Sequence, residues 1–460
     1  MTSDTTQVKL RHKLPFIILG IFALFGLFFP TIVPEADPNA PINSGDTAWI
    51  LTASAMVLLM TPGLAFFYAG MVRYKNVVST LLQSFIALGI VTVLWVFVGF
   101  SLAFGESFGG IIGNPASYFM FNNVGWGTHA ALAPTIPLAL FAMFQLKFAI
   151  ITPALITGAL AERIRFTSLM LFIVMFTLFI YAPLAHWTWN PDGFLRKWGV
   201  LDFAGGTVVH ISAGFAALAG ALMLGKRKSN GHTNHIPANI PYVILGTGLL
   251  WFGWFGFNAG SSLAANELAV RAFVNTAVAS GAAMLSWTFF DSLSGKKRSA
   301  VGASVGAVVG LVAITPAAGY VSVGHSIFIG VVAAMVSNVA VRYKSKTGID
   351  DTLDVFPCHG LGGIVGMILT AVFADNVGII YGQYTTFLYH LLALAIVAVF
   401  TFGGSYGIMW LINKILPMRV SEEYEGKGLD ITQHGEIATD YLLRVHDGNN
   451  EKMQATVNVN

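Results

Sequence analysis

Two stretches of the chain decide its fold: LDFAGGTVVHISAGFAALAG at residues 201–220 and LDVFPCHGLGGIVG at residues 353–366. Each opens with Leu-Asp and then places one histidine, His210 or His359, in an apolar run that is rich in glycine. An apolar segment of about 20 residues crosses the hydrocarbon core of a membrane as a helix. Both stretches therefore predict membrane-spanning helices, and their ionisable side chains, which are costly in lipid, are candidates for function.

Similar apolar segments recur along the whole chain of 460 residues, of which 55% are hydrophobic and 10% charged. In a soluble domain roughly a quarter of the residues are charged, so the composition excludes a soluble globular protein. Eleven segments are long enough to span: 48–70, 77–104, 135–159, 166–186, 204–224, 241–260, 271–292, 300–317, 323–341, 354–374 and 385–415. Lipid tolerates only helices or closed barrels, and these segments are far longer than barrel strands. The predicted fold is an all-α integral membrane protein with eleven transmembrane helices.

The basic residues of the loops predict the orientation of these helices. One alternate set of loops carries thirteen lysines and arginines, and the opposite set carries three. Cytoplasmic loops hold the excess of positive charge, so the segment before residue 48 lies outside and the tail after residue 415 lies inside. The net charge of +3 comes from short separated clusters, which argues against a nucleic-acid partner. The single cysteine, Cys358, excludes a disulfide framework and a thiolate metal site.

The chain divides into three parts. Residues 1–46 contain Lys9, Arg11 and Lys13 followed by an apolar run from residue 14 to residue 33, which fits either a signal peptide or an additional N-terminal transmembrane segment, with an extracytoplasmic linker. Cleavage after Ala36 would leave a proline at the third position before the cut. Residues 47–415 form the membrane domain, and residues 416–460 form a polar cytoplasmic tail.

The odd number of helices allows two inverted five-helix repeats, 48–224 and 241–374, plus an eleventh helix outside the repeat. Such repeats place a functional site at their interface near the bilayer midplane. The matching layout of the two opening stretches supports this arrangement, with Asp202 paired to Asp354 through the Leu-Asp dipeptide. Asp202 is also well placed to cap the helix that starts after it.

The two histidines have alternative interpretations. Two imidazoles in contact can pass a proton while they share one charge. The alternatives are a packing pair bonded to helix backbone, and a metal site, which lacks a third ligand. We expect the flanking glycines to let the two helices approach closely.

Aromatic side chains form two further groups. Phe144 and Phe148 are spaced i, i+4 around Gln145, and Trp254, Phe257 and Ser261 fall on one stripe, with Trp189 at the outer end of the fourth span. An aromatic face attracts a desolvated cation, and a hydroxyl oxygen accepts a hydrogen bond from it. Taken alone, these residues are better explained as an interfacial belt with packing contacts.

Several longer motifs carry a family resemblance. They are FQLKFAIITPALITGALAERIRF, LDFAGGTVVH, GWFGFNAGS, NELAVRAFVNT, DDTLDVFPCHG and GLDITQHGE, in order from about Gly45 to about Asp440. In these motifs the chain resembles the bacterial ammonium transporters of the Amt/MEP/Rh family. The resemblance implies a homotrimer in the cell (inner) membrane, with one pore per subunit and no cofactor or metal.

The resemblance also implies roles for individual residues. Trp189, Phe148 and Ser261 look like an outer ammonium-recruitment site, with Phe144 and Trp254 nearby. Phe148 and Phe257 resemble the stacked pair that gates the pore, and His210 and His359 match the twin histidines of its lumen. Asp202 and Gln145 are structural residues near the site.

Two positions depart from the family pattern. Lys147 stands where the family usually has a small or apolar residue, and we expect it to point away from the pore because successive helical residues diverge by about 100 degrees. Pro357-Cys358 precedes His359, and Cys358 is expected to be a buried small hydrophobe.

The implied function is transport of ammonium that is deprotonated at the outer gate and crosses as ammonia. The alternatives are an ammonium sensor, a neutral gas channel of the Rh type and a membrane enzyme, for which the spans hold no nucleophile-base constellation. For the tail, the resemblance implies docking on the cytoplasmic face and a partner of the PII class of nitrogen-signalling proteins. The basic loops at 226–228 and 296–298 would then bond tail carboxylates such as Asp430 and Glu436.

Overall fold

The computed structural model describes residues 10–28, 31–35, 41–228 and 236–438. Its first half contains α1 (Leu10–Phe28), α2 (Ser44–Met71), η1 (Tyr74–Asn76), α3 (Val77–Leu94), η2 (Trp95–Gly99), α4 (Phe100–Phe104), β1 (Ser107–Phe108), β2 (Ile112–Gly113), η3 (Phe119–Phe121), α5 (Leu138–Leu160), α6 (Phe166–Phe176), η4 (Thr177–Tyr181), α7 (Ala182–Trp189), α8 (Phe194–Lys197), η5 (Gly206–Ile211) and α9 (Ser212–Leu224). The second half contains α10 (Ile240–Gly260), α11 (Glu267–Leu293), α12 (Ala300–Ile314), α13 (Val323–Lys344), η6 (Phe356–Leu361), α14 (Gly362–Phe373), η7 (Ile379–Tyr381), α15 (Thr385–Ile415), α16 (Glu422–Lys427) and η8 (Asp430–His434).

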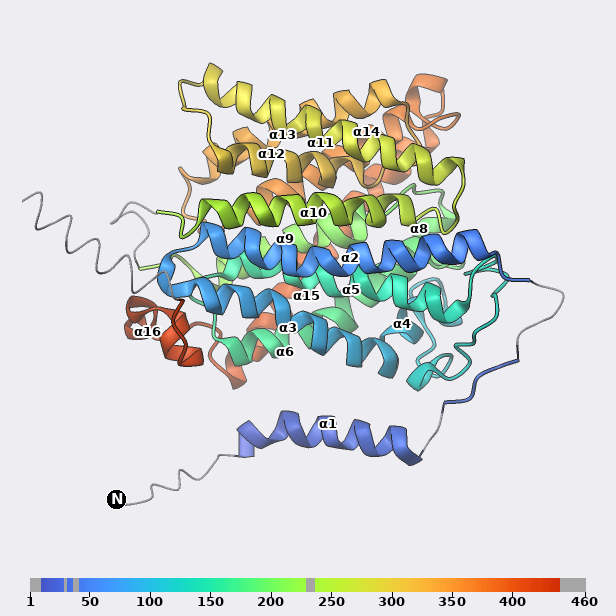
Figure 1. Ribbon diagram of the computed structural model, residues 1–460, viewed down its shortest axis with the longest axis horizontal. Helices are drawn as coiled ribbons and strands as arrows, with labels where there is room; N and C mark the ends of the chain where they lie inside the picture. The colour runs from blue at the N-terminus through green and yellow to red at the C-terminus, as the bar shows by residue number, and fades with distance from the viewer. Residues whose placement is uncertain (1–9, 29–30, 36–40, 229–235, 439–460) are drawn as a thin grey trace, which may run out of the picture.

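The helices run roughly parallel in one bundle (Figure 1). Ten described helices, counting η-linked segments as one, are long and apolar enough to cross a membrane. The eleventh expected span is α12, which has 15 residues and ends at Ile314, three residues before the expected end. The helix stops there because Pro316 follows, and a proline has no amide hydrogen to continue the helical hydrogen bonds.

Polar caps begin many of these helices, as their sequences require. Asn43, Asn239 and Asn266 accept a hydrogen bond from the amide three residues ahead in α2, α10 and α11, and Ser299 and Ser322 do the same in α12 and α13. These side chains satisfy amides that the first helical turn leaves unpaired. The helix boundaries are therefore fixed by local sequence at the bundle's two ends.

The two halves meet where two short π-helical segments cross. A side chain at Gly214 of α9 would collide with the backbone of Gly360 in η6, and one at Gly363 of α14 would collide with Ile211 in η5. Residue 214 meets residue 360, whereas the earlier residue 211 meets the later residue 363. The two segments therefore run antiparallel. This agrees with the predicted inverted repeats, and α10 packs against α2 as the first helix of each half (Figure 1).

A small β-hairpin and turns fill the long connection between α4 and α5. Strands β1 and β2 pair antiparallel with Ser107 opposite Gly113. The connection lies at the end of the bundle opposite α16, which the sequence predicts to face outside (Figure 1).

Candidate functional site

Two aspartates hold the histidine-bearing segments in place. Asp202 accepts hydrogen bonds from the amides of Gly205 (2.8 Å), Gly206 (2.6 Å) and Thr207 (2.7 Å) at the start of η5. Asp351 accepts hydrogen bonds from the amides of Val355 (3.0 Å) and Phe356 (2.7 Å) at the start of η6. Each carboxylate therefore caps a segment whose first amides would otherwise be buried without a partner.

The structure corrects the predicted match between Asp202 and Asp354. The cap of η6 is Asp351, which precedes His359 by eight residues, as Asp202 precedes His210 by eight. Asp354 instead pairs with Lys344 and has a left-handed φ of 58°. Burial raises the pKa of Asp354 to about 6 although Lys344 opposes that rise. The equal spacing was present in the sequence and was obscured by the Leu-Asp dipeptide.

His210 and His359 meet in the interior of the bundle. Their Nδ1 atoms lie 3.3 Å apart, their ring centroids 5.5 Å apart, and both residues are buried. Nδ1 of one ring must donate to Nδ1 of the other, so one Nε2 is an acceptor and the other carries a proton. Nε2 of His210 has no partner among the described residues. The pair thus presents one free donor and one free acceptor in an apolar interior.

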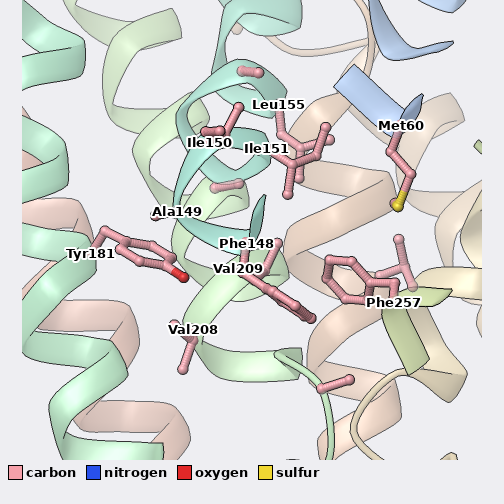
Figure 2. Close-up of a cluster of buried hydrophobic side chains, with 14 of the residues drawn as sticks. Met60, Phe148, Ala149, Ile150, Ile151, Leu155, Tyr181, Val208, Val209 and Phe257 are labelled. Carbon is pink, nitrogen blue, oxygen red and sulfur yellow. The ribbon is translucent and has the colours of Figure 1, made fainter. Parts of the chain in front are cut away.

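Aromatic rings close the outer side of this pair. Trp254 stacks on His210 at 5.3 Å, and Phe257 lies 6.0 Å from the same imidazole. Phe148 and Phe257 face each other with ring centroids 4.2 Å apart, and both are buried within an apolar cluster (Figure 2). The structure therefore brings the predicted gate residues together directly outside the histidines.

A cavity of about 220 Å³ lies on the far side of Phe148. It is lined by the predicted residues Phe148, Trp189, Ser261, Gln145 and Asp202, among others. Ser261 donates its hydroxyl hydrogen to the Phe257 carbonyl at 2.8 Å, which leaves its oxygen free to accept. Gln145 Oε1 is buried without a partner among the described residues. The cavity therefore offers acceptor oxygens beside aromatic faces.

Trp189 is held in this cavity from both sides. Its indole Nε1 donates to the Asp202 carbonyl at 3.2 Å, and its ring packs edge-on against Phe148 at 5.6 Å. Asp202 thus has two structural tasks, because its side chain caps η5 while its backbone orients Trp189. The predicted capping role of Asp202 agrees with these contacts.

Two predicted substrate residues lie outside the cavity. Phe144 packs behind Phe148 at 5.0 Å and fills the space beside Gly260, where a side chain would collide with its ring. Trp254 donates its indole hydrogen to Thr315 at 2.9 Å and faces the histidines. Both residues therefore pack against the Phe148–Phe257 pair and do not line the cavity.

The residues that depart from the family pattern also have places in the structure. Lys147 is half-buried on α5, does not line the cavity, and makes no hydrogen bond or ion pair with the described part of the chain. Cys358 is buried and unpaired. Among described residues, no three potential metal-ligating side chains lie together.

An ion-pair network, which sequence reasoning missed, joins the loops at the end of the bundle that the sequence predicts to be cytoplasmic, here called the inner end. Glu162 binds Arg73 at 2.8 Å and Arg227 at 2.7 Å, and Arg227 also binds Asp350 at 2.9 Å. Burial alone would raise the pKa of Glu162, but the two arginines outweigh it and hold that pKa at about 2. The network ends beside Asp351, the cap of the His359 segment. Isolated charges in separate loops gave no sequence signal for it.

The described part of the tail docks on this inner end. Asp430 accepts hydrogen bonds from the amides of Val78 (3.1 Å) and Ser79 (2.7 Å), and Gln433 accepts from Phe166 at 2.7 Å. Burial raises the pKa of Asp430 to about 6, although these amides oppose the rise. The expected bond between Asp430 and a basic loop is therefore wrong, because helix amides occupy this carboxylate.

A different acidic pair of the tail meets the basic loop. Lys228 binds Glu422 through its ammonium group and donates its amide to Glu425 at 2.6 Å. In the described part of the chain, residues 296–298 make no ion pair with the tail. The loop at 226–228 thus contacts the tail as expected, through other carboxylates.

The fold is that of a multi-pass helical membrane protein with an aromatic cavity and a buried histidine pair, and comparisons with known proteins identify its family. Residues 48–439 match the model of the Ammonium Transporter Family, so the chain belongs to that family. An ammonium transporter of Aquifex aeolicus is 46% identical over 92% of this chain and 97% of its own length. The ammonium transporter of Bacillus subtilis is 44% identical over 86% of this chain and 99% of its own length.

Solved structures agree with this assignment. The crystal structure of Candida albicans Mep2 matches with a TM-score of 0.79 at 34% identity, covering 84% of this chain and 89% of Mep2. A structure described as a sensor Amt protein matches with a TM-score of 0.78 at 30% identity, covering 85% of this chain and 98% of the sensor. The chain therefore belongs to a transporter family and not to a family of enzymes.

Proposed function

We propose that this protein carries ammonium nitrogen across the cell membrane by binding ammonium in the outer cavity, removing its proton and passing ammonia beside the histidines. The observation that carries this proposal is the buried histidine pair directly behind a closed aromatic gate. A hydrated cation loses its water at great cost in such an apolar interior. Neutral ammonia crosses it far more cheaply.

Ammonium is bound in the outer cavity by complementary groups. The ring faces of Trp189 and Phe148 attract the cation, and the free oxygens of Ser261 and Gln145 accept its hydrogen bonds. An unpaired buried oxygen such as Gln145 Oε1 is costly unless a ligand satisfies it. A donor-rich cation of the size of ammonium is a suitable ligand for this oxygen.

The histidine pair then accepts ammonia and relays the proton. The free acceptor and the free donor of the two imidazoles match the lone pair and the hydrogens of ammonia. When a proton enters at one Nε2, the shared Nδ1 hydrogen shifts to the other ring and its Nε2 hydrogen is released. This transfer exchanges the tautomers of the two rings, so both rings must return to their first tautomers before the pair accepts another proton from the same side.

Three further properties belong to the same proposal. The protein assembles as a homotrimer, lies in the cytoplasmic membrane with its C-terminus inside, and binds a PII-class protein at the inner face. The side chains exposed on α11 and α13 are largely apolar, which suits subunit or lipid contacts. The docked tail at the inner end supports a regulatory contact there.

The test is current recording with reconstituted protein on a supported membrane. Ammonium should evoke a current in the wild type, and His210→Ala or His359→Ala should abolish it, whereas His325→Ala on α13 should preserve it as a matched control. Potassium should evoke no current because it has no proton to give up. Full current in both histidine variants, or equal potassium and ammonium currents, would contradict the proposal.

The same recording decides between the alternatives. A sensor remains a candidate because one structural neighbour is described as a sensor Amt protein. A sensor would bind ammonium without sustained flux. A neutral channel of the Rh type would alkalinise the vesicle interior without carrying current.

A further inference from the structure

The described N-terminal helix α1 is anchored to the bundle by aromatic contacts. Phe22 stacks on Phe97 of η2 with ring centroids 4.2 Å apart, and Phe25 packs edge-on against Phe119 of η3 at 5.7 Å. The helix runs along the outside of the bundle, parallel to the membrane-spanning helices (Figure 1). Its other face is open and apolar, with Phe16 79% exposed, as suits a helix that faces lipid.

The segment after α1, residues 31–35, is bonded to an outer loop, and we call this segment the strap. The Ile32 amide donates to Asn122 Oδ1 at 2.8 Å, and the Ile32 carbonyl accepts from the Asn123 amide at 2.9 Å. The hydroxyl of Thr31 donates to the Met120 carbonyl at 3.2 Å. The strap thus pairs with residues 120–123 through both its backbone and its side chains.

The loop that receives the strap is strained. Met120, Phe121 and Asn123 have positive φ angles of 55°, 59° and 63°. Such conformations are unfavourable in residues other than glycine and persist only where surrounding contacts hold them. The strap supplies bonds to two of these three residues. Without it, the loop would lose part of what holds this geometry.

This loop leads directly to the ammonium cavity. The carbonyls of Gly125 and Gly127 accept from the amides of Ala139 and Leu138 at 3.1 and 2.8 Å, which ties the loop to the start of α5. Between these ties, residues 131 and 132 line the cavity. A contact between the strap and residues 120–125 is therefore connected to the cavity rim and to the helix that carries Phe148.

We propose that residues 10–35 are retained in the mature protein as a twelfth transmembrane helix and a strap, and that the strap positions the rim of the ammonium cavity. Lys13, near the start of α1, then lies on the cytoplasmic side, in agreement with the charge rule for the loops. The positioning role rests on the proposed function of that cavity. The retention of the helix does not.

Retention is tested by the intact mass of the full-length protein purified from membranes. The mass should include residues 10–35, and a mature chain that begins after residue 36 would overturn the proposal. Packing is tested with Phe22→Cys and Phe97→Cys in a Cys358→Ser background. A short bis-maleimide should link the two cysteines within one chain, and the absence of this link in a protein that reacts at both sites would also overturn it.

The positioning role is tested with Asn122→Ala, which removes the acceptor of the Ile32 amide. The matched control is Asn114→Ala, because the Asn114 side chain accepts only a local amide of the same outer connection. Loss of one hydrogen bond corresponds to about a fivefold change in an equilibrium constant. We expect about a fivefold rise in the half-saturating ammonium concentration for Asn122→Ala, at unchanged maximal current, and none for the control.

The outcomes separate the two proposals. A half-saturating concentration in Asn122→Ala equal to that of the wild type overturns the positioning role. An equal rise in Asn114→Ala also overturns it, because any disturbance of the outer connection would then have the same effect. A wild type without ammonium current overturns the proposed function, while the mass and the cross-link still decide whether the helix is retained.

Discussion

The inner ion-pair network makes a sharp prediction for Glu162→Gln. Glu162 is fully buried between Arg73 and Arg227, and its pKa is about 2 in place of an ordinary 4.5. A difference of about 2.5 between the two pKa values corresponds to about 3.4 kcal/mol of stability at neutral pH, since each pKa unit is worth about 1.36 kcal/mol. The neutral amide loses this stabilisation and leaves two arginines short of a counter-charge. Breaking a buried pair costs about 3–5 kcal/mol, which agrees.

The pH dependence of this effect has a definite direction. Because the folded-state pKa lies below the unfolded one, the stabilisation is complete above about pH 4.5 and is lost as the pH falls towards 2. We expect Glu162→Gln to lower the melting temperature of the purified protein at pH 7. At pH 3 the difference in the free energy of unfolding between wild type and Glu162→Gln should shrink to about 1.4 kcal/mol, because part of the wild-type stabilisation is already lost.

The matched control is Glu423→Gln, since Glu423 pairs with Lys427 on the exposed surface of α16. Ion pairs on the surface contribute little to stability, so this variant should have the same melting temperature as the wild type at both pH values. The measurement is thermal unfolding in one detergent, followed by tryptophan fluorescence. Equal melting temperatures for Glu162→Gln and wild type at pH 7, or a difference that does not shrink at pH 3, would refute the reasoning.

Three further predictions concern transport. Asp351→Ala should reduce the ammonium current on supported membranes several-fold, because it removes the cap of the segment that carries His359. Asp351→Asn should retain more current than Asp351→Ala. Identical currents in the two variants would refute this prediction. Lys147→Met should leave the half-saturating ammonium concentration unchanged and alter trimer stability in native mass spectrometry, whereas a several-fold gain in flux would place Lys147 in the pore. Deletion of residues 428–460 and Gly435→Asp should both lower transport without dissociating the trimer, since Gly435 has a φ of 69°; normal transport in the truncated protein would contradict the docked tail.

The spans could be predicted from the sequence because length and hydropathy are local properties. The π-helical segments that start at Gly206 and Phe356 could not be predicted from the sequence, because they depend on contacts between residues that are not adjacent in the chain. Each needs an aspartate that reaches over the first amides, and each needs close contact at Gly214 and Gly360 between halves of the chain. A sequence pattern shows the glycines and the aspartates but not which of them meet.

The aromatic residues illustrate a similar limit. The i, i+4 spacing placed Phe144 and Phe148 on one face, and their rings do contact each other. Which of them lines the cavity depends on α10, where Gly260 leaves space that Phe144 fills. Phe148 is thereby left to face Trp189 and Phe257. Spacing predicts a shared face, and only the neighbouring helix decides the role of each residue on it.

The charges around the histidines argue for a neutral permeant. The nearest acidic caps, Asp202 and Asp351, direct their oxygens to backbone amides, so neither offers a free carboxylate to a passing cation. The rings that contact His210, apart from His359, belong to Trp254 and Phe257. A cation at this depth would meet only aromatic faces and the two imidazoles, and a protonated histidine pair would repel it. Deprotonation before the gate avoids this repulsion, which is why the proton and the nitrogen are expected to separate at Phe148.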